Sequence, residues 1–87
     1  MSKVVVYSSA NCPYCVRAKE LLDRKGIQYD EIRVDQDTNQ RDFMMEKSGR
    51  RTVPQIFIND QPIGGCDDLY ALEKSGELAR LLAGEPR

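Results

Sequence analysis

Two cysteines separated by two residues, Cys12 and Cys15, are the side chains in this sequence best suited to chemistry. They belong to the run Cys-Pro-Tyr-Cys, which follows a short apolar segment and precedes residues with helical periodicity. Pro13 suits the first position of a helix, because that position has no N–H partner to lose. Free backbone N–H groups at a helix start favour an anion, and they can lower a thiol pKa from about 8.5 to roughly 3.5–7.5. We therefore predict that Cys12 is an exposed thiolate nucleophile and that Cys15, one turn later, is the resolving thiol.

The same cysteine pair is compatible with two other interpretations, half of a zinc site or an inert buried pair. Structural zinc sites take four protein ligands. The sequence offers Cys66 as its third cysteine and has no histidine, so a carboxylate would have to complete the set. An inert pair fits a helix start less well than a reactive pair. The spacing therefore favours a redox-active pair in a strand–helix–strand setting, and we expect no metal site.

The composition excludes several other classes of protein. The absence of histidine excludes Cys-His proteases and Ser-His-Asp hydrolases. A net charge of −1 argues against electrostatic recruitment to nucleic acid or to a membrane surface. No segment approaches the roughly 20 apolar residues of a membrane span, and the first apolar run is too short for a signal peptide. We expect a cytoplasmic protein with mostly reduced thiols, in which residues 1–87 form a single domain.

The elements that must position the cysteines are predicted from hydrophobic periodicity and turn residues. Residues 4–7 predict a strand buried on both faces, and a helix from Pro13 is expected to end near Gly26. The remaining expected elements are, in chain order, a strand at residues 27–34, a helix capped by Thr38 and ended at Gly49, strands at residues 53–58 and 61–63, and a helix opened by Asp67 and Asp68 that breaks near Gly76. The apolar cluster Phe43-Met44-Met45 of the second helix is expected to pack in the core.

This order of elements, β-α-β-α-β-β-α, predicts an α/β fold. The first crossover should be right-handed, which makes the first two strands parallel, and the Asn59-Asp60 turn makes the last two antiparallel. The result is a four-stranded mixed sheet with helices on both faces, which explains a first strand that is apolar throughout.

Three motifs in matching order carry a resemblance to a known family. They are Cys-Pro-Tyr-Cys after the first predicted strand, Thr-Val-Pro at residues 52–54, and Gly-Gly-Cys-Asp-Asp at residues 64–68. Together they make the sequence resemble a dithiol glutaredoxin over residues 4–82. The resemblance implies a thioredoxin-like (glutaredoxin) fold and a glutathione-dependent thiol–disulfide oxidoreductase.

The activity implied by the resemblance is the reduction of protein–glutathione mixed disulfides and protein disulfides through Cys12 and Cys15. Glutathione would be a co-substrate, with no tightly bound cofactor. Expected partners are glutathionylated or disulfide-containing proteins, with ribonucleotide reductase as a candidate by family analogy, and the chain is expected to be a monomer. Two alternatives are a redoxin reduced by thioredoxin reductase and a glutaredoxin that holds an iron–sulfur cluster between two subunits. Pro13 disfavours the second by family habit.

The resemblance also implies a glutathione site. Thr52, Val53 and Pro54 would form one side of it, with Pro54 in the cis form and the outward-turned Val53 backbone paired with the extended peptide. Tyr14 would flank the bound tripeptide.

A glycine-rich segment would bind the γ-glutamyl end of glutathione. Gly65 allows close approach, and the helix start holds the carboxylate while Asp67 binds the ammonium group. Cys66 is expected to contribute its backbone N–H rather than its thiol. Many glutaredoxins have a lysine three residues before the first cysteine, where this sequence has Ser9. The candidates to replace that cation are Arg17, Arg50 and Arg51.

Overall fold

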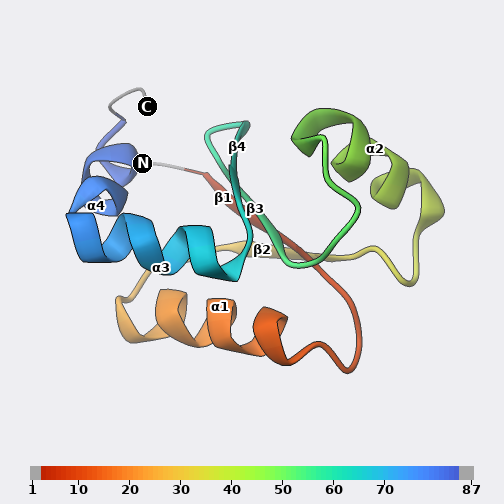
Figure 1. Ribbon diagram of the computed structural model, residues 1–87, viewed down its shortest axis with the longest axis horizontal. Coiled ribbons are helices and arrows are strands. Elements are labelled where there is room, and N and C mark those ends of the chain that lie inside the picture. The colour runs from red at the N-terminus through yellow and green to blue at the C-terminus, as the bar shows by residue number, and fades with distance from the viewer. Residues whose placement is uncertain (1–2, 85–87) are drawn as a thin grey trace.

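The computed structural model describes residues 3–84, and strands alternate with helices along most of that range. The elements are β1 (Val4–Ser8), α1 (Pro13–Arg24), β2 (Asp30–Arg33), α2 (Thr38–Ser48), β3 (Gln55–Ile58), β4 (Gln61–Gly64), α3 (Cys66–Ser75) and α4 (Glu77–Leu82). The strands form one sheet in the order β2-β1-β3-β4 (Figure 1). β1 runs parallel to β2 and antiparallel to β3, which pairs antiparallel with β4. This is the predicted mixed sheet.

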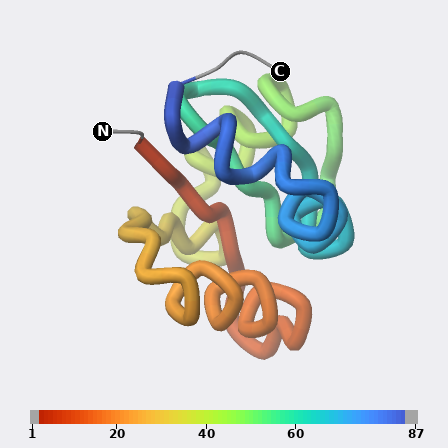
Figure 2. Tube along the Cα trace, turned by 90° about the vertical axis from the view of Figure 1, so that its left-hand side faces the viewer, coloured from red at the N-terminus to blue at the C-terminus, as the bar shows by residue number. Residues whose placement is uncertain are grey.

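Helices cover both faces of this sheet, and each face has its own apolar cluster. On one face Val6 of β1 packs with Leu22 of α1 and Leu69 of α3. On the other face Tyr7 packs with Met44 of α2. The alternation along β1 explains why four of its five residues are buried. Figure 2 shows this strand, in red, followed after a short loop by α1, in orange.

The predicted strand bounds differ most from the observed ones in β2 and β3. A single strand is expected at residues 27–34, but only Asp30–Arg33 pairs with β1, because β1 is short and the ladder runs only from Val5 opposite Asp30 to Ser8 opposite Arg33. Ile27 and Tyr29 instead pack against the core from the preceding loop. β3 begins at Gln55 rather than at residue 53, after a cis Val53–Pro54 bond whose proline has no N–H to donate.

The observed helix ends also differ from the predicted ones. The cap of α2 is Asp37, not Thr38, and the Asp37 carboxylate accepts hydrogen bonds from the N–H groups of Asn39 (3.0 Å) and Gln40 (3.2 Å). Aspartate is at least as good a cap as threonine, so Asp37 takes this role and the helix cap lies one residue before the predicted one. α3 begins at Cys66, one residue before the predicted start, and the predicted break at Gly76 is confirmed by its left-handed backbone. Phe43 is not in the core, since it is 40% exposed.

Candidate functional site

The start of α1 carries a disulfide between Cys12 and Cys15, with Cα atoms 5.2 Å apart. Cys12 is the cap residue of the helix, and Pro13 occupies the first helical position as predicted. The backbone N–H of Cys15 points at the Sγ of Cys12, with 3.2 Å between nitrogen and sulfur. Cys12 is partly exposed, whereas Cys15 is only 1% exposed. An incoming thiol can therefore reach the sulfur of Cys12 more readily than that of Cys15.

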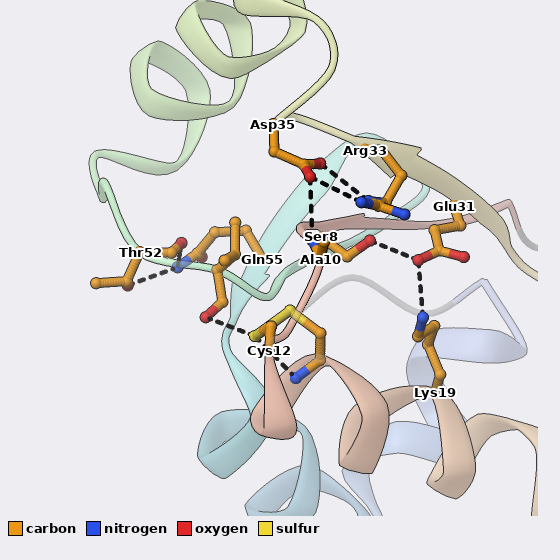
Figure 3. Close-up of a disulfide and its surroundings, with 11 residues drawn as sticks. Ser8, Ala10, Cys12, Lys19, Glu31, Arg33, Asp35, Thr52 and Gln55 are labelled. Atoms are coloured by element: carbon orange, nitrogen blue, oxygen red, sulfur yellow. Dashed lines mark hydrogen bonds and ion pairs between the residues drawn. A yellow bond between two sulfur atoms is a disulfide. The ribbon is translucent and has the colours of Figure 1, made fainter.

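The loop between β1 and α1 is held by an acidic side chain from the turn that follows β2 (Figure 3). The Asp35 carboxylate accepts a hydrogen bond from the N–H of Ala10 (3.2 Å) and forms an ion pair with Arg33 (2.7 Å). The hydrogen bonds from the Arg33 guanidinium lower the pKa of Asp35 to about 2. The carboxylate thus stays ionised and keeps the loop that presents Cys12 in place.

The segment before β3 lies beside the disulfide. The Sγ of Cys12 is 3.8 Å from the carbonyl oxygen of Val53, and Val53 is joined to the buried Pro54 by the cis bond. The side chain of Gln55 reaches back under this segment, and its Nε2 donates to the carbonyl oxygen of Thr52 at 3.0 Å (Figure 3). The cis bond predicted from the family resemblance is present.

The site has three walls: the start of α1, the segment before β3, and the start of α3. Asp68 accepts a hydrogen bond from the N–H of Gly65 (2.9 Å) and pairs with the Arg50 guanidinium (2.9 Å), so it joins α3 to the segment before β3. Gly64 has a φ of +112°, and a Cβ at this position would collide with the Asp68 carboxylate. A Cβ at Gly65 would come within 3.2 Å of the Pro54 carbonyl oxygen. The positive φ and the adjacent Asp68 carboxylate thus favour glycine at position 64, and the close approach of the Pro54 carbonyl favours glycine at position 65.

Together these walls enclose a groove of about 200 Å³. It is lined by Tyr14, Arg50, Thr52, Val53, Pro54, Gln55, Gly65, Cys66, Asp67 and Asp68. All seven residues predicted for the glutathione site lie in this lining. The lining residues that the sequence does not predict for the site are Gln55 and Asp68, together with Arg50, which is predicted only as a replacement cation. The sequence does predict Asp68 at the start of the last helix, within the Gly-Gly-Cys-Asp-Asp motif, and there its carboxylate closes the helix cap.

Cys66 lines the groove, but its side chain belongs to the core. It is 5% exposed and packs in the apolar cluster with the residues of α1 and α3. Burial raises the pKa of its thiol above the ordinary value. Of the arginines considered for the missing lysine, Arg50 lies in the groove lining, whereas the Arg17 guanidinium carbon lies 5.9 Å from the centre of the Tyr14 ring.

A second groove of about 600 Å³ lies on the side of the disulfide that faces β2. Cys12 and Cys15 line it together with Lys19, Glu31 and Arg33. Glu31 pairs with Lys19 (2.8 Å), and its carboxylate also accepts a hydrogen bond from the buried hydroxyl of Ser8 (Figure 3). These hydrogen bonds lower the pKa of Glu31. Charged side chains therefore line both grooves, but the cysteine pair itself lines the second.

Residues 3–84 contain neither a membrane span nor a metal cluster. None of the helices in this range combines the length and the apolar character that crossing a bilayer requires. No group of three or more His, Cys, Asp or Glu side chains in the same range is arranged to hold a metal ion.

The chain is similar to known proteins over nearly all of its length. The family model named Glutaredoxin matches residues 4–63. Glutaredoxin 3 of Escherichia coli K12 is 52% identical over 82 residues, covering 94% of this chain and 99% of that protein. A glutaredoxin of Pseudomonas aeruginosa is 51% identical over 83 residues, covering 95% and 99%.

Solved structures agree with these sequence matches. The solution structure of glutaredoxin from Brucella melitensis has a TM-score of 0.84 and 50% identity, covering 98% of this chain and 94% of that one. A crystal structure of a buckwheat glutaredoxin–glutathione complex has a TM-score of 0.86 and 35% identity, covering 95% and 78%. The thioredoxin-like fold is shared with them. The chain belongs to the glutaredoxin family and is a glutathione-dependent thiol–disulfide oxidoreductase.

Proposed function

We propose that Cys12 is the nucleophile, that Cys15 is the resolving thiol, and that glutathione binds in the groove between the Thr52–Pro54 segment and α3. The observation that carries this proposal is the place of the Cys12 sulfur. It is the more accessible sulfur of the pair, it receives the N–H of Cys15, and it lies 3.8 Å from the Val53 carbonyl at the edge of the groove. Glutathione held there would have its sulfur beside Cys12.

The reaction with a glutathionylated protein has two exchange steps. The Cys12 thiolate attacks the glutathione sulfur of the mixed disulfide, and the protein thiolate leaves and takes up a proton. A second glutathione, as its thiolate, then attacks the glutathionyl sulfur on Cys12, which releases glutathione disulfide and restores the Cys12 thiolate. The rate depends on which sulfur is attacked, so the orientation of bound glutathione directs the chemistry.

The reaction with a protein disulfide uses both cysteines. The Cys12 thiolate attacks one sulfur of the substrate and displaces the other as a thiolate. Cys15, after losing its proton, attacks Cys12 and releases the reduced protein, which leaves the Cys12–Cys15 disulfide. Two glutathione molecules then reduce that disulfide in the same way.

The groove offers complementary groups for glutathione. The Val53 backbone would pair with the cysteinyl residue, as in strand addition, while the N–H groups at the start of α3 and the Asp67 carboxylate would bind the γ-glutamyl end. Arg50 is the cation we assign to a glutathione carboxylate, in place of the lysine that Ser9 replaces. The similar buckwheat glutaredoxin was crystallised as a complex with glutathione, which supports glutathione as the ligand of this chain as well.

We further propose that residues 1–87 act as one domain and as a monomer in the cytoplasm, with glutathionylated or disulfide-containing proteins as substrates. Ribonucleotide reductase remains a candidate by family analogy. Residues 1–2 and 85–87 lie outside the described residues.

A coupled assay tests the proposal. The reduced protein is given a glutathionylated peptide with glutathione, NADPH and glutathione reductase, and in parallel with thioredoxin reductase in place of the glutathione system. We expect turnover with the glutathione system and none with thioredoxin reductase. Turnover only with thioredoxin reductase would instead identify a redoxin of the same fold, and anaerobic purification of a coloured, iron-containing dimer would favour the cluster-binding alternative.

A further inference from the structure

Gln55 is a buried polar side chain in an otherwise apolar strand. It is 1% exposed and begins β3, whose other residues are Ile56, Phe57 and Ile58. Its Nε2 donates to the Thr52 carbonyl oxygen at 3.0 Å and lies 3.4 Å from the Thr52 hydroxyl. A carbonyl oxygen can only accept, so the nitrogen of the amide must be the atom that faces it. The amide oxygen, Oε1, has no hydrogen-bond partner among residues 3–84.

The fold does not need this amide. Burial of an unpaired amide oxygen destabilises the folded state, and an apolar side chain of the same length would avoid that penalty. Thr52 is exposed, so water could satisfy its carbonyl oxygen without Gln55. A glutamine here gives a poorer core than a methionine would, which points to a function for its donor atoms.

The hydrogen bond acts on a peptide group that borders the groove. The Thr52 carbonyl and the Val53 N–H belong to one planar trans peptide unit, in which C=O and N–H point in opposite directions. Because Gln55 holds the carbonyl oxygen, the Val53 N–H must point to the opposite side of this peptide, away from the Gln55 amide. A hydrogen bond to the carbonyl also polarises the peptide and makes its N–H a better donor.

We propose that Gln55 is a positioning residue of the glutathione site, which orients the Val53 N–H for pairing with the ligand backbone through its grip on Thr52. The proposal rests on the proposed function, since it takes Val53 as the residue that pairs with glutathione. Gln55 touches no reacting atom, so it acts on binding rather than on the exchange of sulfurs.

The variant Gln55→Met tests this role, because methionine is similar in length and has no donor. We expect KM for a glutathionylated peptide to rise about tenfold with kcat near the wild-type value, as for the loss of one hydrogen bond in binding. The melting temperature should stay equal or rise, because the unpaired oxygen is gone. Ile58→Val is the control, since it shrinks a buried side chain of β3 in the other apolar cluster and should lower the melting temperature without raising KM.

An unchanged KM in Gln55→Met would overturn the proposal, as would a loss of activity that follows the melting temperature in both variants. A second measurement does not depend on activity. In ¹⁵N-correlated NMR spectra, Gln55→Met should shift the Val53 amide resonance in the protein without glutathione, and an unshifted resonance would refute the positioning role. If the wild type shows no glutathione-dependent turnover, the proposed function fails, and the NMR result still reports whether Gln55 orients the Val53 N–H.

Discussion

The starts of α1 and α3 each place a cysteine beside the free N–H groups of a helix, but the two thiols have opposite environments. At α1 the cap residue is Cys12 itself, whose sulfur receives the N–H of Cys15 and is partly exposed. At α3 the cap residue is Gly65, and the Asp68 carboxylate accepts its N–H. Cys66 follows at the first helical position with its side chain turned into the core.

The difference shows that a helix start does not by itself activate a thiol. The helix dipole favours an anion at both positions, yet burial raises the pKa of Cys66. Cys12 is the cap and is partly exposed, whereas Cys66 is neither the cap nor open to solvent. We therefore expect the start of α1 to stabilise a thiolate and the start of α3 to bind a carboxylate of the ligand.

The largest expected effect comes from exchanging sulfur for oxygen at each cysteine. Cys12→Ser should reduce deglutathionylation to background, because a serine hydroxyl is a weak nucleophile at neutral pH. Cys15→Ser should keep that activity but lose the resolution of protein disulfides, and Cys66→Ser should resemble the wild type in both. The coupled glutathione assay measures all three. Loss of deglutathionylation in both Cys12→Ser and Cys15→Ser would contradict the route through Cys12 alone.

The next effect is the pH dependence of alkylation in the reduced protein. Cys12 should react with iodoacetamide with an apparent pKa of roughly 3.5–7.5. Cys66 should react slowly, with a pKa above the ordinary value of a thiol, because burial disfavours its thiolate. Mass spectrometry of peptides from each pH resolves the two sites. An apparent pKa near the ordinary value of about 8.5 for Cys12 would show that the helix start does not activate it.

A substitution at Gly64 should have a smaller effect, which is confined to the start of α3. Gly64→Ala places a Cβ against the Asp68 carboxylate at a positive φ, and it should destabilise the protein by about 1–3 kcal/mol. Gly26→Ala is the matched control, because it has a positive φ but open space around a Cβ. Denaturant unfolding gives both values. Gly64→Ala should also raise KM for a glutathionylated peptide while leaving the alkylation pKa of Cys12 unchanged.

The smallest effect concerns the carboxylate that holds the loop before α1. The pKa of Asp35 is lowered to about 2, from about 3.9 for an aspartate in an unfolded chain. A depressed pKa stabilises the fold above about pH 4, and this contribution is lost as the pH falls from about 4 to about 2. The melting temperature of Asp35→Asn should therefore fall less over this interval than that of the wild type. The exposed Asp42→Asn on α2 is the control and should follow the wild type.

Much of the fold could be predicted from the sequence, because strands and helices here follow hydrophobic periodicity closely. The buried strand β1 and the helix from Pro13 are examples. The boundaries that differed depend on pairing partners. The second strand is short because its neighbour spans only Val4–Ser8, and no local pattern in residues 27–34 reports the length of another strand.

Part of the candidate site could likewise be predicted from the sequence, and part could not. The cysteine pair and the residues of the groove follow from motifs that are continuous in the sequence. The role proposed for Gln55 could not be foreseen, because a single glutamine in an apolar run does not reveal which backbone atom it binds. Nor does the sequence indicate that Cys66 turns inward, since that depends on how α3 lies against the sheet.

The order of the strands has one further consequence, for association between copies of the chain. It leaves β2 and β4 at the two edges of the sheet, where unpaired backbone groups can recruit strands from other molecules. Three of the four residues of β2 are charged, and β4 carries Pro62, which has no N–H. Both features discourage aggregation through the edges. The Val53 backbone is proposed to pair with an extended ligand, whereas the two edge strands of the sheet disfavour such pairing.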